Sequence, residues 1–141
     1  QIDATGLYEF DVTMEYYYNQ LPPRYEKQGA LGVTSPWNVN IEIDCCCACR
    51  KWKLNFAIRG ELVIHIRNEG DWDTIAHEES HARNFYRAFL AFAKQKAYLE
   101  KVEWSSEPAC NLSKNGLRSE FYSMRMHANM MEVIHATPGR W

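Results

Sequence analysis

The chain lacks the clustered positive charge and the long apolar run that are typical of nucleic-acid-binding and membrane-spanning proteins. Its 141 residues carry 16 Lys and Arg against 18 Asp and Glu, which gives a formal net charge of −2. The basic residues are scattered along the sequence, so we expect no nucleic-acid partner and no polybasic membrane patch. No apolar run approaches the ~20 residues of a membrane span. At this length we expect a single domain over residues 1–141, with a core of its own.

Cysteine is not scarce, and its positions are unusual. Four of the five cysteines lie close together, at Cys45, Cys46, Cys47 and Cys49. A disulfide between one of these four and the distant Cys110 would suit an exported protein. Two alternatives stay open, a thiolate metal site and buried free thiols. Together with a glycosylation pattern at residues 111–113, the cysteines favour a secreted or periplasmic location.

The first half of the chain alternates between apolar and polar residues, as β-strands do. Four runs show this alternation, at residues 8–18, 37–45, 52–58 and 62–66. We expect a loop between the first two runs, and a turn at Arg59 and Gly60 between the last two. Each run has one apolar face, which predicts a largely antiparallel sheet of about four strands covered on one side. His65 falls on the less apolar face and is expected at the surface.

Two helices are predicted after the strands. The first covers residues 71–101, with Asp71 or Asp73 as its cap. Its apolar arc consists of Ile75, Ala82, Phe85, Phe89 and Phe92. The second covers residues 117–136 and ends before Pro138. With residues 1–67 mainly in strands, the pattern predicts an α+β fold in which a sheet packs against two helices.

The first predicted helix contains a His-Glu-x-x-His motif, from His77 through Glu78 to His81. Residues four apart lie on one helical face about a turn apart, so both imidazoles can reach one ion. Glu78, between them, can hold and deprotonate a metal-bound water. The alternative is a solvated helix start that carries two unrelated histidines.

A catalytic zinc takes three protein ligands and keeps a fourth position for water, so the motif needs a third ligand. The continuation of the motif to a third histidine is missing, because Asn84 and Arg87 stand at the two positions that it requires. We expect Glu120 as the third ligand, since it lies on the margin of the buried stripe of the second helix. The next candidates are His127, and then Glu103 or Glu107.

Over residues 61–136 the chain resembles the gluzincin group of zinc metallopeptidases. In that group, the His-Glu-x-x-His helix is followed by a second helix with a Glu ligand. The segment that begins at Glu120 and has Ser123 three positions later is similar to that second helix. The resemblance implies a zincin-like fold and a Zn²⁺ ion. It also implies hydrolysis of a peptide or protein substrate, with a zinc-activated water and Glu78 as general base.

The resemblance also implies how a substrate would be held. Residues 61–67 would form a sheet edge that pairs with an extended substrate. The oxyanion would be stabilised by zinc and one nearby donor, for which Tyr122, Arg125 and His127 are candidates.

A second class of function stays open beside the peptidase. The chain can be an exported structural or self-assembling protein on a zincin-like fold, with zinc structural or absent. Its eight Tyr residues and odd number of cysteines would suit self-association. It can also be a binding protein that keeps the fold without turnover.

Overall fold

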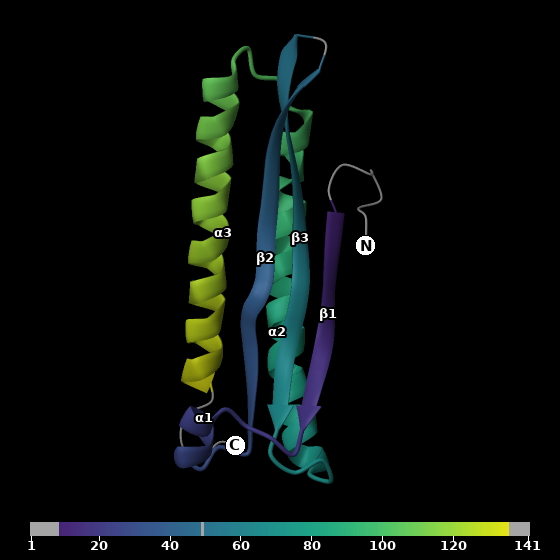
Figure 1. Ribbon diagram of the computed structural model, residues 1–141, viewed down its shortest axis with the longest axis vertical. Helices are drawn as coiled ribbons and strands as arrows, with labels where there is room; N and C mark the ends of the chain where they lie inside the picture. Colours follow the sequence, from purple (N-terminus) through teal and green to yellow (C-terminus); the bar gives the residue numbers. More distant parts are fainter. Residues whose placement is uncertain (1–8, 49, 136–141) are drawn as a thin grey trace.

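A computed structural model describes residues 9–48 and 50–135 of the chain. It shows an α+β fold, in which a three-stranded sheet packs against two long helices (Figure 1). The elements are β1 (Glu9–Tyr18), α1 (Pro23–Lys27), β2 (Gly32–Ala48), β3 (Lys51–Ile66), α2 (Trp72–Lys96), the 3₁₀ helix η1 (Ala97–Lys101) and α3 (Glu107–His135). None of the helices in these residues is long and apolar enough to cross a membrane.

The sheet is mixed, with three strands in the order β1-β3-β2, and this corrects the expectation of about four largely antiparallel strands. β2 and β3 form a long antiparallel pair, while β1 pairs with β3 in parallel. The parallel pairing arises because the chain reverses direction twice between β1 and β3, so that both strands run the same way. β3 is the central strand. The expectation that residues 61–67 form a free sheet edge is therefore wrong.

The two runs expected as a third and a fourth strand are one continuous strand, because Gly60 does not turn the chain. Gly60 has a φ of 139°, a conformation that favours glycine. A Cβ at this position would lie 1.9 Å from the carbonyl oxygen of Asn38. Gly60 pairs with Val39, and the register shift between Ser35 and Asn38 in β2 lies two residues further along β3, opposite Leu62. The glycine therefore allows a close backbone approach inside the sheet, beside a bulge.

Both long helices begin at polar caps. Asp71 caps α2 by accepting the Thr74 N–H at 3.2 Å, as the sequence predicts. α2 ends at Lys96, and η1 takes up the rest of the predicted span. α3 begins ten residues earlier than expected, at Glu107, where Ser106 Oγ accepts the Ala109 N–H at 3.3 Å. Its first turns were missed because residues 111–116 are mostly polar or Gly and show no apolar period.

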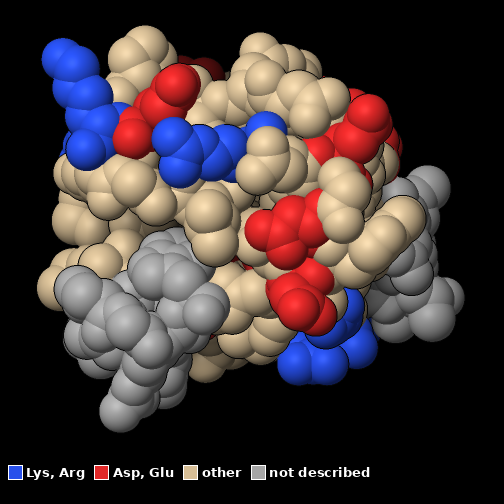
Figure 2. All heavy atoms as spheres, turned by 90° about the horizontal axis from the view of Figure 1, so that it is seen from below, with Lys and Arg blue, Asp and Glu red and all other residues tan. Residues whose placement is uncertain are grey.

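The core lies between the inner face of the sheet and the two helices. Its largest fully buried side chains include Phe10, Leu54, Ile58, Leu62, Ile64, Ile66, Phe85, Phe89, Leu117 and Phe121. His65 lies on the other face of the sheet, as predicted, but it is half-buried and stacks on Tyr17 with ring centroids 5.1 Å apart. On the end of the molecule that carries α1, charges of both signs are interspersed (Figure 2).

β1 does not run beside the N-terminal part of β3, because β1 begins opposite Ala57. There, the buried carboxylate of Glu100 accepts the Phe56 N–H at 2.8 Å. Trp104 forms an isolated bridge with Trp52, with two backbone bonds of 2.9 Å. These contacts satisfy backbone groups of β3 that would otherwise have no partner in β1.

A disulfide joins Cys45 of β2 to Cys110 of α3, with the Cα atoms 6.2 Å apart, and confirms the predicted pairing. Cys46 and Cys47 are free and exposed, so the alternative of buried free thiols does not hold for either of them. Cys49 lies outside the described residues. The disulfide attaches the first turn of α3 to the far end of β2, which is consistent with an oxidising location.

Replacement of Cys110 by Ser should lower the free energy of unfolding by about 4 kcal/mol in the chain-entropy view. The reason is the length of the closed loop, since the two cysteines are 65 residues apart. Denaturant unfolding measures this difference, and Cys46→Ser is the matched control because Cys46 is free and exposed. Peptide mapping without reduction should recover the Cys45–Cys110 link. Five alkylatable thiols in unreduced protein would contradict the prediction.

Candidate metal centre

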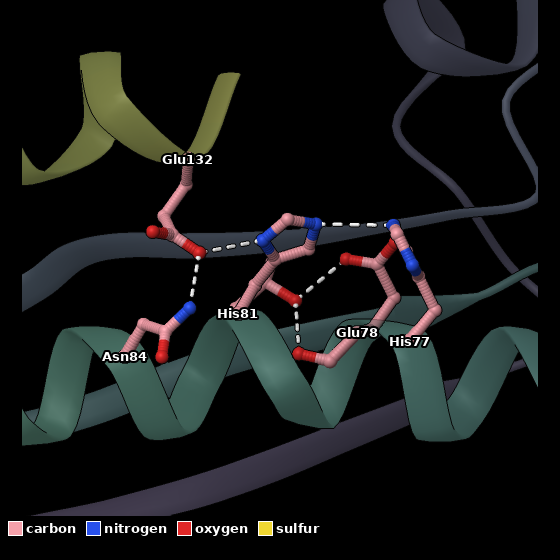
Figure 3. A network of polar contacts seen from close by, with 6 residues as sticks. His77, Glu78, His81, Asn84 and Glu132 are labelled. Atoms are coloured by element: carbon pink, nitrogen blue, oxygen red, sulfur yellow. Dashed lines mark hydrogen bonds and ion pairs between the residues drawn. The ribbon is translucent and has the colours of Figure 1, made fainter. Parts of the chain in front are cut away.

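His77 and His81 lie one turn apart near the start of α2, and their side chains converge (Figure 3). Their Nε2 atoms are 3.1 Å apart, and the two rings meet edge to face with centroids 4.7 Å apart. An ion at roughly 2.0–2.1 Å from both nitrogens would make an N–metal–N angle of about 100°, close to the ~109° of a tetrahedral site. The same distance suits a hydrogen bond between the two rings, so an ion would displace one proton.

His81 is held in one orientation by Glu132, which the sequence analysis missed. His81 Nδ1 donates to Glu132 Oε1 at 2.7 Å, and Asn84 Nδ2 donates to the same oxygen at 3.0 Å (Figure 3). A proton on Nδ1 leaves the lone pair of Nε2 directed at His77. Carboxylates hold metal-binding histidines in this way. The sequence does contain one indication of this role, since Glu132 is the only acidic residue between Phe121 and His135.

Glu78 is fully buried, with 0% of its surface exposed. The Thr34 hydroxyl lies 2.7 Å from Glu78 Oε1, to which it donates, and 3.0 Å from the Glu78 carbonyl oxygen. Glu78 Oε2 is buried and has no hydrogen-bond partner among the described residues. A buried carboxylate oxygen without a partner is costly, and a metal ion or a metal-bound water would supply one.

The three side chains form one group that could hold a metal ion. One ligand atom each from His77, Glu78 and His81 lies within 4.8 Å of the other two. Burial raises the pKa of Glu78, against the opposing effects of the Thr34 hydrogen bond and of His81. Burial, and then the neighbouring His81, lower the pKa of His77. His77 is therefore favoured as the neutral imidazole, which is the form that binds metals.

Gly32, at the start of β2, leaves the space that Glu78 occupies. A Cβ at this position would lie 2.8 Å from Glu78 Cγ and 2.9 Å from Thr74 Cγ2. Both distances are shorter than van der Waals contact, so the first residue of β2 has to be a glycine for Glu78 to pack as it does.

β1 also contacts this part of α2, where the Tyr16 hydroxyl donates to Glu79. Burial is the larger cause and this hydrogen bond the next, and together they raise the pKa of Tyr16 to about 12.

A cleft of about 850 Å³ lies beside the group, and Glu78, His81 and Glu132 line it. Its other walls come from α1, from the segment that leads into β2, and from the end of α3. The residues that line these walls include Arg24, Tyr25, Leu31, Trp37 and Val133. The group therefore adjoins a cavity large enough for a small molecule or a peptide segment.

The other predicted ligands do not reach the two imidazoles. Glu120 is more than half exposed and pairs with Lys96 at 2.5 Å. It precedes Glu132 by twelve residues, about 18 Å along a helix. The acid that α3 brings to the site is therefore Glu132 in place of Glu120. His127, Glu103 and Glu107 are exposed, and none of them joins the described group.

The predicted oxyanion donors have structural contacts instead. Arg125 Nη1 donates to the carbonyl oxygens of Val39 at 2.8 Å and Trp37 at 3.1 Å. The Arg125 guanidinium also lies over the ring of Tyr122, 4.8 Å from its centroid. Arg125 therefore attaches α3 to the edge of β2, and its guanidinium packs on the ring of Tyr122. His127 is exposed on α3 and does not line the cleft.

Comparison with known proteins identifies no relative, because no family model, no curated protein and no solved structure matches the chain. The contacts of His77, Glu78 and His81 are therefore the basis for the chemistry of the site.

The role of Glu132 can be tested through the affinity for Zn²⁺. Replacement of Glu132 by Ala should weaken Zn²⁺ binding about 10- to 100-fold, because His81 would lose the carboxylate that orients it. Glu120→Ala is the matched control and should leave the affinity unchanged. Competition with a chromophoric chelator measures both affinities. Equal affinities of the two variants would mean that Glu132 does not support the site.

Proposed function

We propose that the protein is a zinc-dependent peptidase, with His77 and His81 as metal ligands and Glu78 as general base. The observation that carries this proposal is the convergence of the two Nε2 atoms at 3.1 Å, with the Glu78 carboxylate in the same group. The adjoining cleft gives such a group access to a substrate. The Cys45–Cys110 disulfide supports action outside the reducing cytosol.

The donor set favours zinc over a hard cation such as magnesium. Two neutral imidazole nitrogens are typical zinc ligands, whereas magnesium takes oxygen ligands in an octahedron. Among the described residues, the only further member of the group is Glu78. A zinc ion there would have at least one position for water, which catalytic zinc requires.

The mechanism assigns the two Glu78 oxygens to different tasks. When bound, zinc would supply a Lewis acid and a water of lowered pKa. Thr34 holds Glu78 Oε1, so Oε2 is the atom free to take a proton from that water. Glu78 would then donate that proton to the amine nitrogen as the peptide C–N bond breaks. Its raised pKa brings its proton affinity closer to neutrality, where a group can act as both base and acid.

The competing proposal is a structural zinc site, and the complete burial of Glu78 favours it. In that case the Glu78 carboxylate would itself bind the ion as a third ligand. The metal would then stabilise the packing of α2 against β2, and the protein would have a structural or assembly role. The two proposals differ in what the loss of the Glu78 charge does to zinc binding.

Protein purified without chelator should contain about one zinc per chain. The double variant His77→Ala, His81→Ala should lose it, because both nitrogen ligands are removed. His127→Ala is the matched control, since His127 is an exposed histidine on α3. Metal analysis by mass spectrometry gives the content of each protein. Unchanged zinc in the double variant would refute the assigned ligands.

Replacement of Glu78 by Gln should abolish peptide hydrolysis but retain zinc. The amide keeps the shape and the Thr34 hydrogen bond, yet it cannot accept the proton, so a loss of at least about 10²-fold is expected. A library of internally quenched peptides measures turnover, with Glu120→Gln as control. Loss of zinc from the variant would instead assign Glu78 as a metal ligand. A zinc-loaded wild type that cleaves no peptide in the library would support the structural proposal.

A further inference from the structure

α3 carries an exposed stripe that contains no charged residue. We call it the outer stripe, and it consists of Leu112, Gly116, Ser119, Ser123, Met126, Met130 and Val133. The positions are separated alternately by four and three residues, so they follow one face of the helix. Its four large members are 56–76% exposed. The stripe points away from the sheet, because the buried Phe121 lies on the opposite face of α3.

The outer stripe is long as well as uncharged. From Leu112 to Val133 it covers 21 residue steps, or about 32 Å at 1.5 Å per residue. Met126, Met130 and Val133 are consecutive members of the stripe, and contiguous exposed apolar side chains are typical of a surface that binds another molecule.

The order of large and small residues in the outer stripe is self-complementary. In a second α3 laid antiparallel and centred at Ser123, Met126 falls opposite Ser119, and Met130 falls opposite Gly116. Each long methionine would then meet a small residue, while Leu112 would meet Val133 at both ends. In a parallel pair each residue would face its own copy, so Gly116, Ser119 and Ser123 would leave a gap in the middle. Close packing therefore favours the antiparallel arrangement.

We propose that the outer stripe is the interface of a homodimer, in which two copies of α3 pack antiparallel about a twofold axis at Ser123. The residues beside the stripe fit this arrangement. On one side Glu120 of each copy, which also pairs with Lys96 of its own chain, would face His127 of the other, and both side chains are exposed. On the other side the flanking residues are the uncharged Asn115, Tyr122 and Asn129. No like charges oppose each other across the axis.

The size of the stripe sets the expected strength of the dimer. A face about 32 Å long and about 10 Å wide has an area of about 320 Å² per copy, which is in the range of weak, transient interfaces. The dimer should therefore be weak, with a Kd of roughly 0.1 mM. Val133 also lines the cleft beside the metal group, but none of the metal-group residues belongs to the outer stripe, and the dimer requires no peptidase activity.

Sedimentation velocity over a range of protein concentrations tests the dimer. Wild type should sediment as a reversible dimer, and Met126→Glu with Met130→Glu should weaken it at least about 100-fold, because two charges per chain would be buried without partners. Tyr98→Glu is the matched control, since Tyr98 is as exposed as Met126, at 59%, and lies in η1. A wild type that stays monomeric up to about 1 mM (~4 kcal/mol of association energy) would overturn the proposal, and so would a dimer that the double variant does not weaken.

Disulfide cross-linking tests the antiparallel geometry. In a protein with Cys46, Cys47 and Cys49 replaced by Ser, Ser123→Cys should cross-link on oxidation, because the two copies meet at the axis. Ser119→Cys should not, since its copies would be displaced by more than about 10 Å along the helix, beyond the reach of a disulfide. Cross-linking of both variants to the same extent would indicate a parallel pair, and cross-linking of neither would exclude the proposed axis.

Discussion

The hydrogen bond between His81 and Glu132 joins the two long helices at the candidate site, and the site depends on it. Contacts near its start, middle and end attach α3 to the rest of the described fold. The Cys45–Cys110 disulfide fixes its first turn, Arg125 bonds to β2 carbonyls near its middle, and Glu132 bonds to His81 in its last turns. A shift of α3 along its axis would break all three contacts at once. The orientation of one imidazole is therefore set by the packing of the whole helix.

The burial of Glu78 is the second constraint, because a carboxylate with no exposed surface is unfavourable unless its oxygens are satisfied. Thr34 satisfies one oxygen, and Gly32 provides the space. The other oxygen has no hydrogen-bond partner among the described residues. Groups held in such unfavourable surroundings are concentrated at functional sites. A free carboxylate oxygen beside two converging imidazoles suits a metal ligand as well as a general base.

The local parts of this arrangement could be predicted from the sequence. The convergence of His77 and His81 follows from helical spacing, and the Asp71 cap follows from its position before an apolar period. Glu132 could not be predicted, because its position depends on how far α3 slides along α2. The same applies to the parallel pairing of β1, which depends on the path of the chain between strands. Gly60 was misread as a turn because a glycine beside a bulge and a glycine in a turn look alike in a single sequence.

α3 combines two surfaces with different requirements, and this explains its uneven sequence. The face that includes Phe121 and Leu117 is apolar because it closes the core. Glu132 lies on the border of that face, where it can reach the site while 14% of its side chain remains exposed. The opposite face needs no apolar residue for the fold, yet it has methionines at Met126 and Met130. Folding of a single chain does not account for an uncharged outer face, whereas packing against a second copy does, since only association removes those side chains from water.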